Sequence, residues 1–107
     1  MSSILLDHCV PKPLRRWLPG ETVRTCHEEG WDTLLNGELL RAAEAAGYEI
    51  FITADKNLRY QQELSSRRIA IIELPTNRLS QMPLLVASLL TAIASATPGG
   101  YQEIPLP

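Results

Sequence analysis

The stretch Tyr48-Glu49-Ile50-Phe51-Ile52-Thr53-Ala54-Asp55 decides the fold class of this chain. The apolar run at its centre, residues 50–52, is typical of a strand that is buried on both faces of a parallel sheet. A similar run, Ser3–Leu6, lies near the start of the chain, and an aspartate, Asp7, follows it directly. The sequence therefore predicts two buried strands, Ser3–Leu6 and Tyr48–Ala54, each ending at an acid.

Outward from these two strands, short β-rich runs alternate with segments of helical spacing. Further strands are expected at Glu21–Cys26, which is rich in β-branched residues, and at Ile69–Leu74. Tyr101–Pro107 fits either a short edge strand or a loose tail. Four helices are expected, at Leu14–Leu18, 36–47, Lys56–Ser66 and Ser80–Ala96. Asn36 is the expected N-cap of the helix at 36–47, and Ser80 that of the last helix.

This alternation predicts an α/β fold, with a four-stranded, mostly parallel sheet and helices on both faces. The 107 residues suffice for a single domain, with residues 98–107 as its C-terminal strand or tail. With the strands in the order 2-1-3-4, the ligand crevice falls between the first and third strands, at their carboxyl ends. Asp7 and Asp55 are the acids at those two ends.

Composition restricts the partners that the chain can have. A net charge of -2 and a pI near 5.6 leave no molecule-wide positive field for nucleic acid, so a local patch or a bound cation has to supply one. Two cysteines are too few for a disulfide scaffold. No segment is typical of a signal peptide, and no apolar run approaches the roughly 18 residues of a membrane span. We therefore expect a cytoplasmic protein with no membrane partner.

Two carboxylates at one crevice favour a bound cation, because without one they repel each other. Oxygen ligands suit Mg²⁺ or Mn²⁺, which can bind a phosphodiester oxygen and activate water. The alternative for each aspartate is turn or cap duty. Glu38, in the first turn of a helix, can serve as a further ligand or simply favour the helix dipole.

Residues after Asp55 could bind a nucleic acid. Tyr60 could stack on a base, and Asn57 could donate to a phosphate or cap the following helix. The alternative for the charged residues is a solvated helix face. The basic side chains expected closest to the crevice are Lys56, Arg59, Arg67 and Arg68.

A zinc site is not expected from the sequence. His8 and Cys9 follow Asp7, and Cys26 and His27 are also neighbours, but this spacing fits no standard zinc pattern. Adjacent side chains in a strand also point to opposite faces. A Cys–His nucleophile has no orienting third group either.

An ordered set of short motifs resembles the PIN-like domains of bacterial toxin–antitoxin systems, in particular a compact branch of that family. The motifs run from about Ile4 to Leu90. They are Ile4-Leu5-Leu6-Asp7 with Cys9-Val10-Pro11, Asn36-Gly37-Glu38-Leu39-Leu40, Phe51-Ile52-Thr53-Ala54-Asp55 with Asn57-Leu58, Tyr60-Gln61-Gln62 and Asn77-Arg78-Leu79.

The resemblance implies a small three-layer PIN-like fold and a metal-dependent endoribonuclease, a hydrolase, that acts as the toxin of a toxin–antitoxin system. Asp7, Glu38 and Asp55 match the family's acids and would be both catalytic residues and ligands of Mg²⁺ or Mn²⁺. The residues that would orient the ligands or contact the RNA substrate are Thr53, Lys56, Asn57, Arg59 and Tyr60.

Two departures from the family pattern support an alternative function. His8 stands where the family commonly has a second acid, and neither Glu73 nor Asn77 matches the fourth acid well. The alternative is a PIN-like interaction module with weak or absent catalysis. The resemblance also implies a small antitoxin protein as a partner of the ribonuclease. The breadth of the apolar face of Ser80–Ala96 also makes a homodimer an open alternative to core packing.

Overall fold

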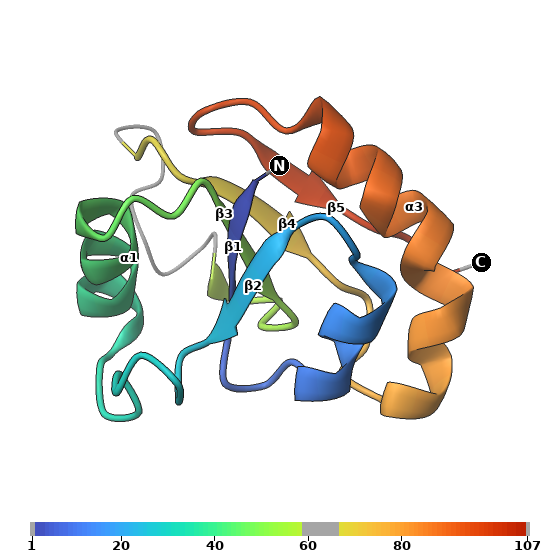
Figure 1. Cartoon of the computed structure of the whole chain (residues 1–107), viewed down its shortest axis with the longest axis horizontal. Helices are drawn as coiled ribbons and strands as arrows, with labels where there is room; N and C mark the ends of the chain where they lie inside the picture. The colour runs from blue at the N-terminus through green and yellow to red at the C-terminus, as the bar shows by residue number, and fades with distance from the viewer. Residues whose placement is uncertain (1, 59–66, 107) are drawn as a thin grey trace.

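The computed structural model describes residues 2–58 and 67–106 of the chain. Five strands form one all-parallel sheet in the order β2-β1-β3-β4-β5, so the order predicted for the first four strands is confirmed (Figure 1). The strands are β1 (Ser3–Leu6), β2 (Thr22–Thr25), β3 (Ile50–Thr53), β4 (Ala70–Glu73) and β5 (Tyr101–Glu103).

The prediction of a four-stranded sheet is wrong, because Tyr101–Glu103 adds a fifth strand at the β4 edge. β5 pairs in parallel with β4, with Tyr101 opposite Ile71. The long helix between these strands provides the crossover that a parallel pair requires. β5 has only three residues, so it is too short to show a clear two-residue alternation in the sequence.

The helices are η1 (Lys12–Trp17), α1 (Asn36–Ala45), η2 (Leu79–Gln81) and α3 (Met82–Ser95). The predicted caps are wrong. Leu35 occupies the N-cap of α1 without a side-chain cap bond, and Asn36 is the first helical residue. Ser80 lies in η2, ahead of α3. The helix predicted at Lys56–Ser66 falls mainly on residues 59–66, which lie outside the described residues.

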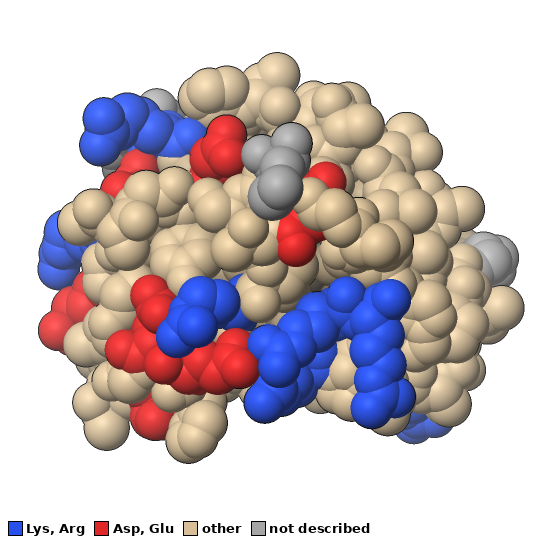
Figure 2. Space-filling view, in the orientation of Figure 1, with Lys and Arg blue, Asp and Glu red and all other residues tan. Residues whose placement is uncertain are grey.

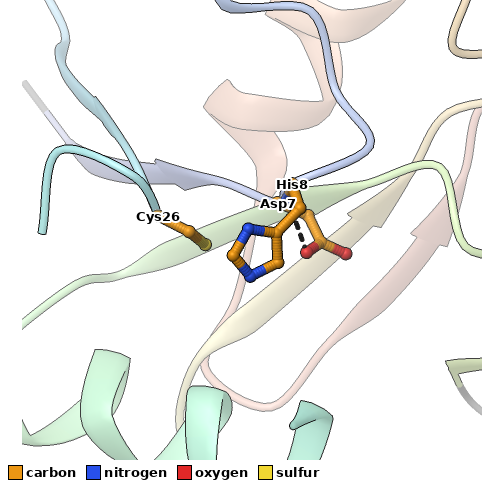
Figure 3. Close-up of side chains that lie close together, drawn as sticks. All are labelled: Asp7, His8 and Cys26. Carbon is orange, nitrogen blue, oxygen red and sulfur yellow. Dashed lines mark hydrogen bonds between the residues drawn. The ribbon is translucent and has the colours of Figure 1, made fainter. Parts of the chain in front are cut away.

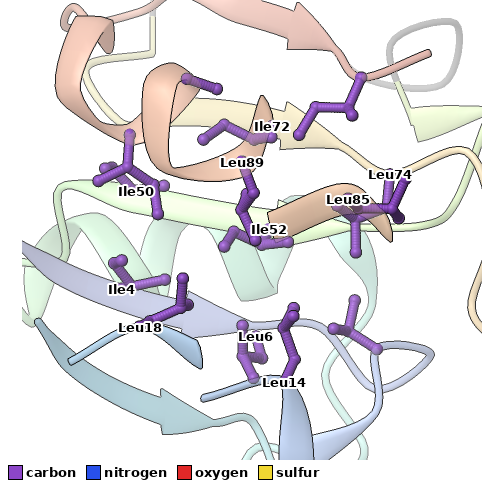
Figure 4. Close-up of a cluster of buried hydrophobic side chains, with 14 of the residues drawn as sticks. Ile4, Leu6, Leu14, Leu18, Ile50, Ile52, Ile72, Leu74, Leu85 and Leu89 are labelled. Carbon is purple, nitrogen blue, oxygen red and sulfur yellow. The ribbon is translucent and has the colours of Figure 1, made fainter. Parts of the chain in front are cut away.

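Helices cover both faces of the sheet. Leu6, Ile52 and Ile72 pack on one face in a core with side chains of η1 and α3 (Figure 4). Leu5 and Phe51, one position earlier in their strands, pack on the other face with side chains of α1. Strands buried on both faces explain the unbroken apolar runs in the sequence. Within residues 2–58 and 67–106, no helix is long and apolar enough to cross a membrane.

Candidate functional site

Asp7 lies in the middle of the carboxyl edge of the sheet. It directly follows β1, and its backbone N–H donates to the carbonyl of Ile52 in β3 at 2.9 Å. On the other side, the N–H of Cys26, which follows β2, donates to the carbonyl of Leu6 at 3.1 Å. The strand pairings therefore put Asp7 between Cys26 and Thr53, the last residue of β3.

These side chains lie on the α1 side of the sheet. Leu5 and Phe51, which precede Asp7 and Thr53 by two positions, belong to the core on that side, and Cys26 is a member of the same core. Since side chains two positions apart share a face, the polar groups continue the apolar face to the end of the sheet.

A chain of hydrogen bonds joins the two predicted strand-end acids. The Asp7 side chain is buried, with 6% of its residue surface exposed. Its Oδ2 accepts a hydrogen bond from Thr53 Oγ1 at 2.7 Å, and its Oδ1 accepts one from the N–H of His8 at 2.7 Å. The same Thr53 hydroxyl accepts a hydrogen bond from the N–H of Asp55 at 3.0 Å. Thr53 thus links the side chain of one acid to the backbone of the other.

Asp55 is half-buried and partly engaged in a local turn. Its Oδ1 accepts a hydrogen bond from the N–H of Asn57 at 2.9 Å. This bond is the turn-stabilising role that the sequence offered as the alternative to metal binding. Its Oδ2 lies 3.5 Å from Asn36 Nδ2, so the first turn of α1 lies beside the acid. Asn57 and Lys56 are exposed. Asp55 therefore has a structural role, and its other lone pairs are free for a ligand.

Glu38 does not join this chain. It is exposed in the first turn of α1, and among the described residues no hydrogen bond or ion pair connects it to Asp7 or Asp55. Among the described residues, one group of three brings potential metal-ligand atoms within 4.8 Å of one another. It consists of Asp7, His8 and Cys26. A site made of three acids therefore remains a prediction.

Of the basic residues expected at the crevice, Lys56 follows Asp55, but Arg67 and Arg68 do not lie there. Arg67 and Arg68 precede β4 and so lie at the amino edge of the sheet, and Arg67 pairs with Glu44 at 3.2 Å. Arg59 and Tyr60 lie outside the described residues.

Cationic side chains instead extend along η1. Figure 2 shows this group beside the acidic side chains that follow β2. Lys12 and Arg15 pair with Glu28, at 3.5 and 2.9 Å, whereas Arg16 is exposed and pairs with none of the described residues. The three basic residues Lys12, Arg15 and Arg16 are close together in the sequence, but no sequence pattern predicted that they lie near Asp7. Lys12 and Asp7 line the same cleft.

Glu73 is a further acid at the carboxyl edge of the sheet, where Asp7 and Asp55 also lie. It ends β4 opposite Thr53, only 7% of its surface is exposed, and it accepts a hydrogen bond from the Tyr101 hydroxyl. In the comparison with the PIN-like pattern, Glu73 matched the position of the fourth acid poorly. Its position in the strand register, which depends on how β4 pairs, could not be read from spacing.

A cleft of about 320 Å³ opens next to Asp7, on the β2 side. His8 follows the end of β1, where strand alternation no longer holds, so its imidazole lies next to both Asp7 and Cys26 (Figure 3). The zinc argument from the sequence considered the pairs His8–Cys9 and Cys26–His27, and the group that the structure brings together, Asp7, His8 and Cys26, takes one residue from each pair. The cleft is lined by Asp7, His8, Val10, Lys12, Thr25, Cys26, His27 and Asp32.

Neither cysteine is set up as a nucleophile. Burial, followed by the nearby charge of Asp7, raises the pKa of Cys26 to about 12. Burial likewise raises the pKa of Cys9, whose Sγ lies 3.8 Å from Asp7 Oδ2. Because the thiolate is the attacking form, neither thiol is activated as a nucleophile at neutral pH.

No family model, curated protein or solved structure matches this chain. The function is therefore argued from the site itself.

Proposed function

We propose that this chain is a metal-dependent endoribonuclease of the PIN-like type. The observation that carries the proposal is the hydrogen-bonded series Asp7–Thr53–Asp55 at the carboxyl ends of two adjacent parallel strands. This is the place where ligands bind in open α/β sheets.

The donor set fits Mg²⁺ or Mn²⁺. Carboxylate oxygens are the ligands that these cations prefer. Asp7 Oδ2 accepts hydrogen bonds from Thr53 and from the Cys9 thiol, whereas Oδ1 accepts one, from the N–H of His8, which leaves it a lone pair for a cation. Asp7 and Asp55 would hold the ion. Glu38 would supply a further oxygen, since the contact between Asn36 and Asp55 brings its helix turn to the site.

When bound, the ion would polarise the scissile phosphodiester and lower the pKa of a bound water. The protein's part is orientation. The Thr53 hydroxyl fixes the rotamer of Asp7, and the N–H of Asn57 holds Asp55 Oδ1. Lys12 and Arg16 on η1 offer positive charge to RNA phosphates in a chain that is negative as a whole.

The test incubates the full chain and Asp55→Ala with a labelled single-stranded RNA pool, in Mn²⁺ and in EDTA. We expect the parent to cleave in Mn²⁺ only. Asp55→Ala should lose more than the roughly 10- to 100-fold that changes to outer-shell partners cost. Glu49→Gln, an acid at the amino edge of the sheet, is the matched control and should cleave as the parent does. Equal cleavage by Asp55→Ala and the parent would remove the assignment.

A non-catalytic interaction module is the second candidate. It is favoured by the position of Glu38 apart from the aspartates and by the hydrogen bonds that Asp7 already accepts from His8, Thr53 and Cys9, which orient its carboxylate without a metal. Titration calorimetry separates the two functions. Heat from Mg²⁺ or Mn²⁺ binding that disappears in Asp55→Ala supports the nuclease, and no binding in the folded parent supports the module.

If the chain acts as a toxin, it should also bind a protein partner, which we propose is either a small antitoxin or a second copy of this chain. α3 buries Leu85 and Leu89 but leaves Leu84 60% and Leu90 41% exposed. A molar mass that stays monomeric across a concentration series would exclude the second copy.

A further inference from the structure

We propose that Asp7, His8 and Cys26 bind a thiophilic divalent cation, with Zn²⁺ as the natural ligand. This site faces the cleft on the β2 side of Asp7. The proposal goes beyond the nuclease proposal and does not depend on it, because two of the three ligands take no part in the Asp7–Thr53–Asp55 series.

The sheet itself holds two of the three ligands. Asp7 and Cys26 follow the paired strands β1 and β2, and the hydrogen bond from the N–H of Cys26 to the carbonyl of Leu6 fixes their spacing. Both residues are buried, with 6% and 1% of their surfaces exposed. A ligand pair placed by backbone pairing is already organised before a metal binds, which lowers the cost of binding.

The third ligand can adjust. His8 is exposed, so its ring can rotate at little cost. One ligand atom from each of the three residues lies within 4.8 Å of the others. With Zn–S near 2.3 Å and Zn–N near 2.0 Å, tetrahedral ligands lie about 3.3–3.8 Å apart. A shift of roughly an ångström brings ligand atoms at the 4.8 Å limit to that spacing, and the exposed His8 is the ligand freest to move.

The donor types select the cation. Sulfur, imidazole nitrogen and one carboxylate oxygen form a mixed set that suits Zn²⁺ and not Mg²⁺, which prefers oxygen and water. Cys26 belongs to the core on the α1 side of the sheet, and its sulfur also lies beside a carboxylate and an imidazole at the edge of that core.

The cleft leaves room for a fourth ligand. Its volume of about 320 Å³ accommodates water, and His27 and Asp32 line it as well, with Nδ1 and Oδ1 3.0 Å apart. Among the described residues that line the cleft, Lys12 is the one cation, and its ammonium lies 3.5 Å from the Glu28 carboxylate. The remaining charged lining residues, Asp7 and Asp32, favour a cation.

Cobalt(II) is the probe, because a thiolate-to-cobalt charge-transfer band reports a Co–S bond directly and needs no RNA. We expect the metal-free full chain to develop this band on titration with Co²⁺. Equimolar Zn²⁺ should abolish the band, whereas a large excess of Mg²⁺ should leave it. No band in the parent, or a band that Mg²⁺ removes, would overturn the proposal.

Variants identify the ligands. Cys26→Ser should lose the band, and Cys9→Ala is the matched control, since it removes the other thiol near Asp7 and should keep the band. His8→Ala changes an exposed side chain, keeps the fold, and should weaken Co²⁺ binding by more than about tenfold. A band that survives in Cys26→Ser, or is lost in Cys9→Ala, would contradict the assignment. Because none of these readouts involves cleavage, they separate this site from the nuclease.

Discussion

Thr53 is the most constrained polar residue near the candidate site. Its side chain is fully buried at the end of β3, and its hydroxyl donates to Asp7 Oδ2 and accepts from the N–H of Asp55. Both partners therefore depend on one oxygen atom, and a change at this residue affects stability as well as function.

Thr53→Val keeps the shape of the side chain and removes the hydroxyl. The substitution leaves the buried Asp7 Oδ2 with only the weak thiol donor of Cys9, and we expect the free energy of unfolding to fall by about 1–3 kcal/mol. Urea denaturation at neutral pH measures this loss. Thr53→Ser, which retains the hydroxyl, should recover most of it, and equal stability of Thr53→Val and the parent would show that the hydrogen bonds contribute little.

At this scale the sequence predicted the positions of Asp7 and Asp55 but not their surroundings. Asp7 directly follows one apolar run and Asp55 lies shortly after the other, and the crevice rule then places both at one edge. The grouping of His8 with Cys26 was missed, because the argument from alternating side chains was applied to residues that lie beyond the end of β1. The last residue of a strand is determined by its hydrogen bonds to neighbouring strands, and these bonds cannot be read from the sequence.

At the level of elements, Glu28 ties η1 to the turn after β2. Its carboxylate accepts hydrogen bonds from the N–H of Thr25 at 3.0 Å and from Arg15 Nη1 at 2.9 Å, and it pairs with Lys12. Mainly through the bond to Thr25, and then through Arg15, the pKa of Glu28 falls from its ordinary value of 4.5 to about 2.

Glu28→Gln should therefore lower the melting temperature in a pH-dependent way. A carboxyl whose pKa is lower in the folded chain stabilises it above the unfolded pKa, and that contribution is lost as the pH falls. We expect the difference from the parent to be full above pH 4.5 and to vanish as the pH falls through about 2. Differential scanning calorimetry against pH tests this, with Glu49→Gln as the charge-matched control. A difference that persists unchanged at the lowest pH would contradict the linkage.

The sequence predicted the buried central strands better than the helix termini. Ile50–Thr53 and Ala70–Glu73 are recognisable because burial on both faces requires continuous apolar residues. Asn36 was read as a cap from its preference alone, but the turn before α1 places Leu35 there instead. The prolines at 11 and 13 allowed a helix to be predicted at Leu14–Leu18, and the structure has a 3₁₀ helix at Lys12–Trp17.

At the scale of the whole molecule, charge separates by region. The chain carries a net charge of -2, yet Lys12, Arg15 and Arg16 gather on η1 (Figure 2). Any affinity for RNA should arise from this group and should weaken with salt, since binding to phosphates releases counterions.

The double variant Lys12→Gln/Arg16→Gln tests this charge distribution. For single-stranded RNA each phosphate contact contributes about 0.7 to the salt slope, so two lost contacts should make the slope shallower by about 1.4. Fluorescence anisotropy over a salt series measures it. Arg41→Gln/Arg68→Gln makes the same change in net charge on other surfaces and should leave the slope unchanged. Equal slopes for the η1 variant and the parent would place RNA elsewhere.

Asp7 belongs to both candidate centres, with Thr53 on one side and Cys26 on the other. This sharing limits how the chain can diverge. A substitution at Asp7 would remove cleavage and zinc affinity in one step, whereas substitutions at Thr53 or Cys26 would affect them separately. A lineage that discards one activity and keeps the other should therefore retain Asp7 and change on its flanks.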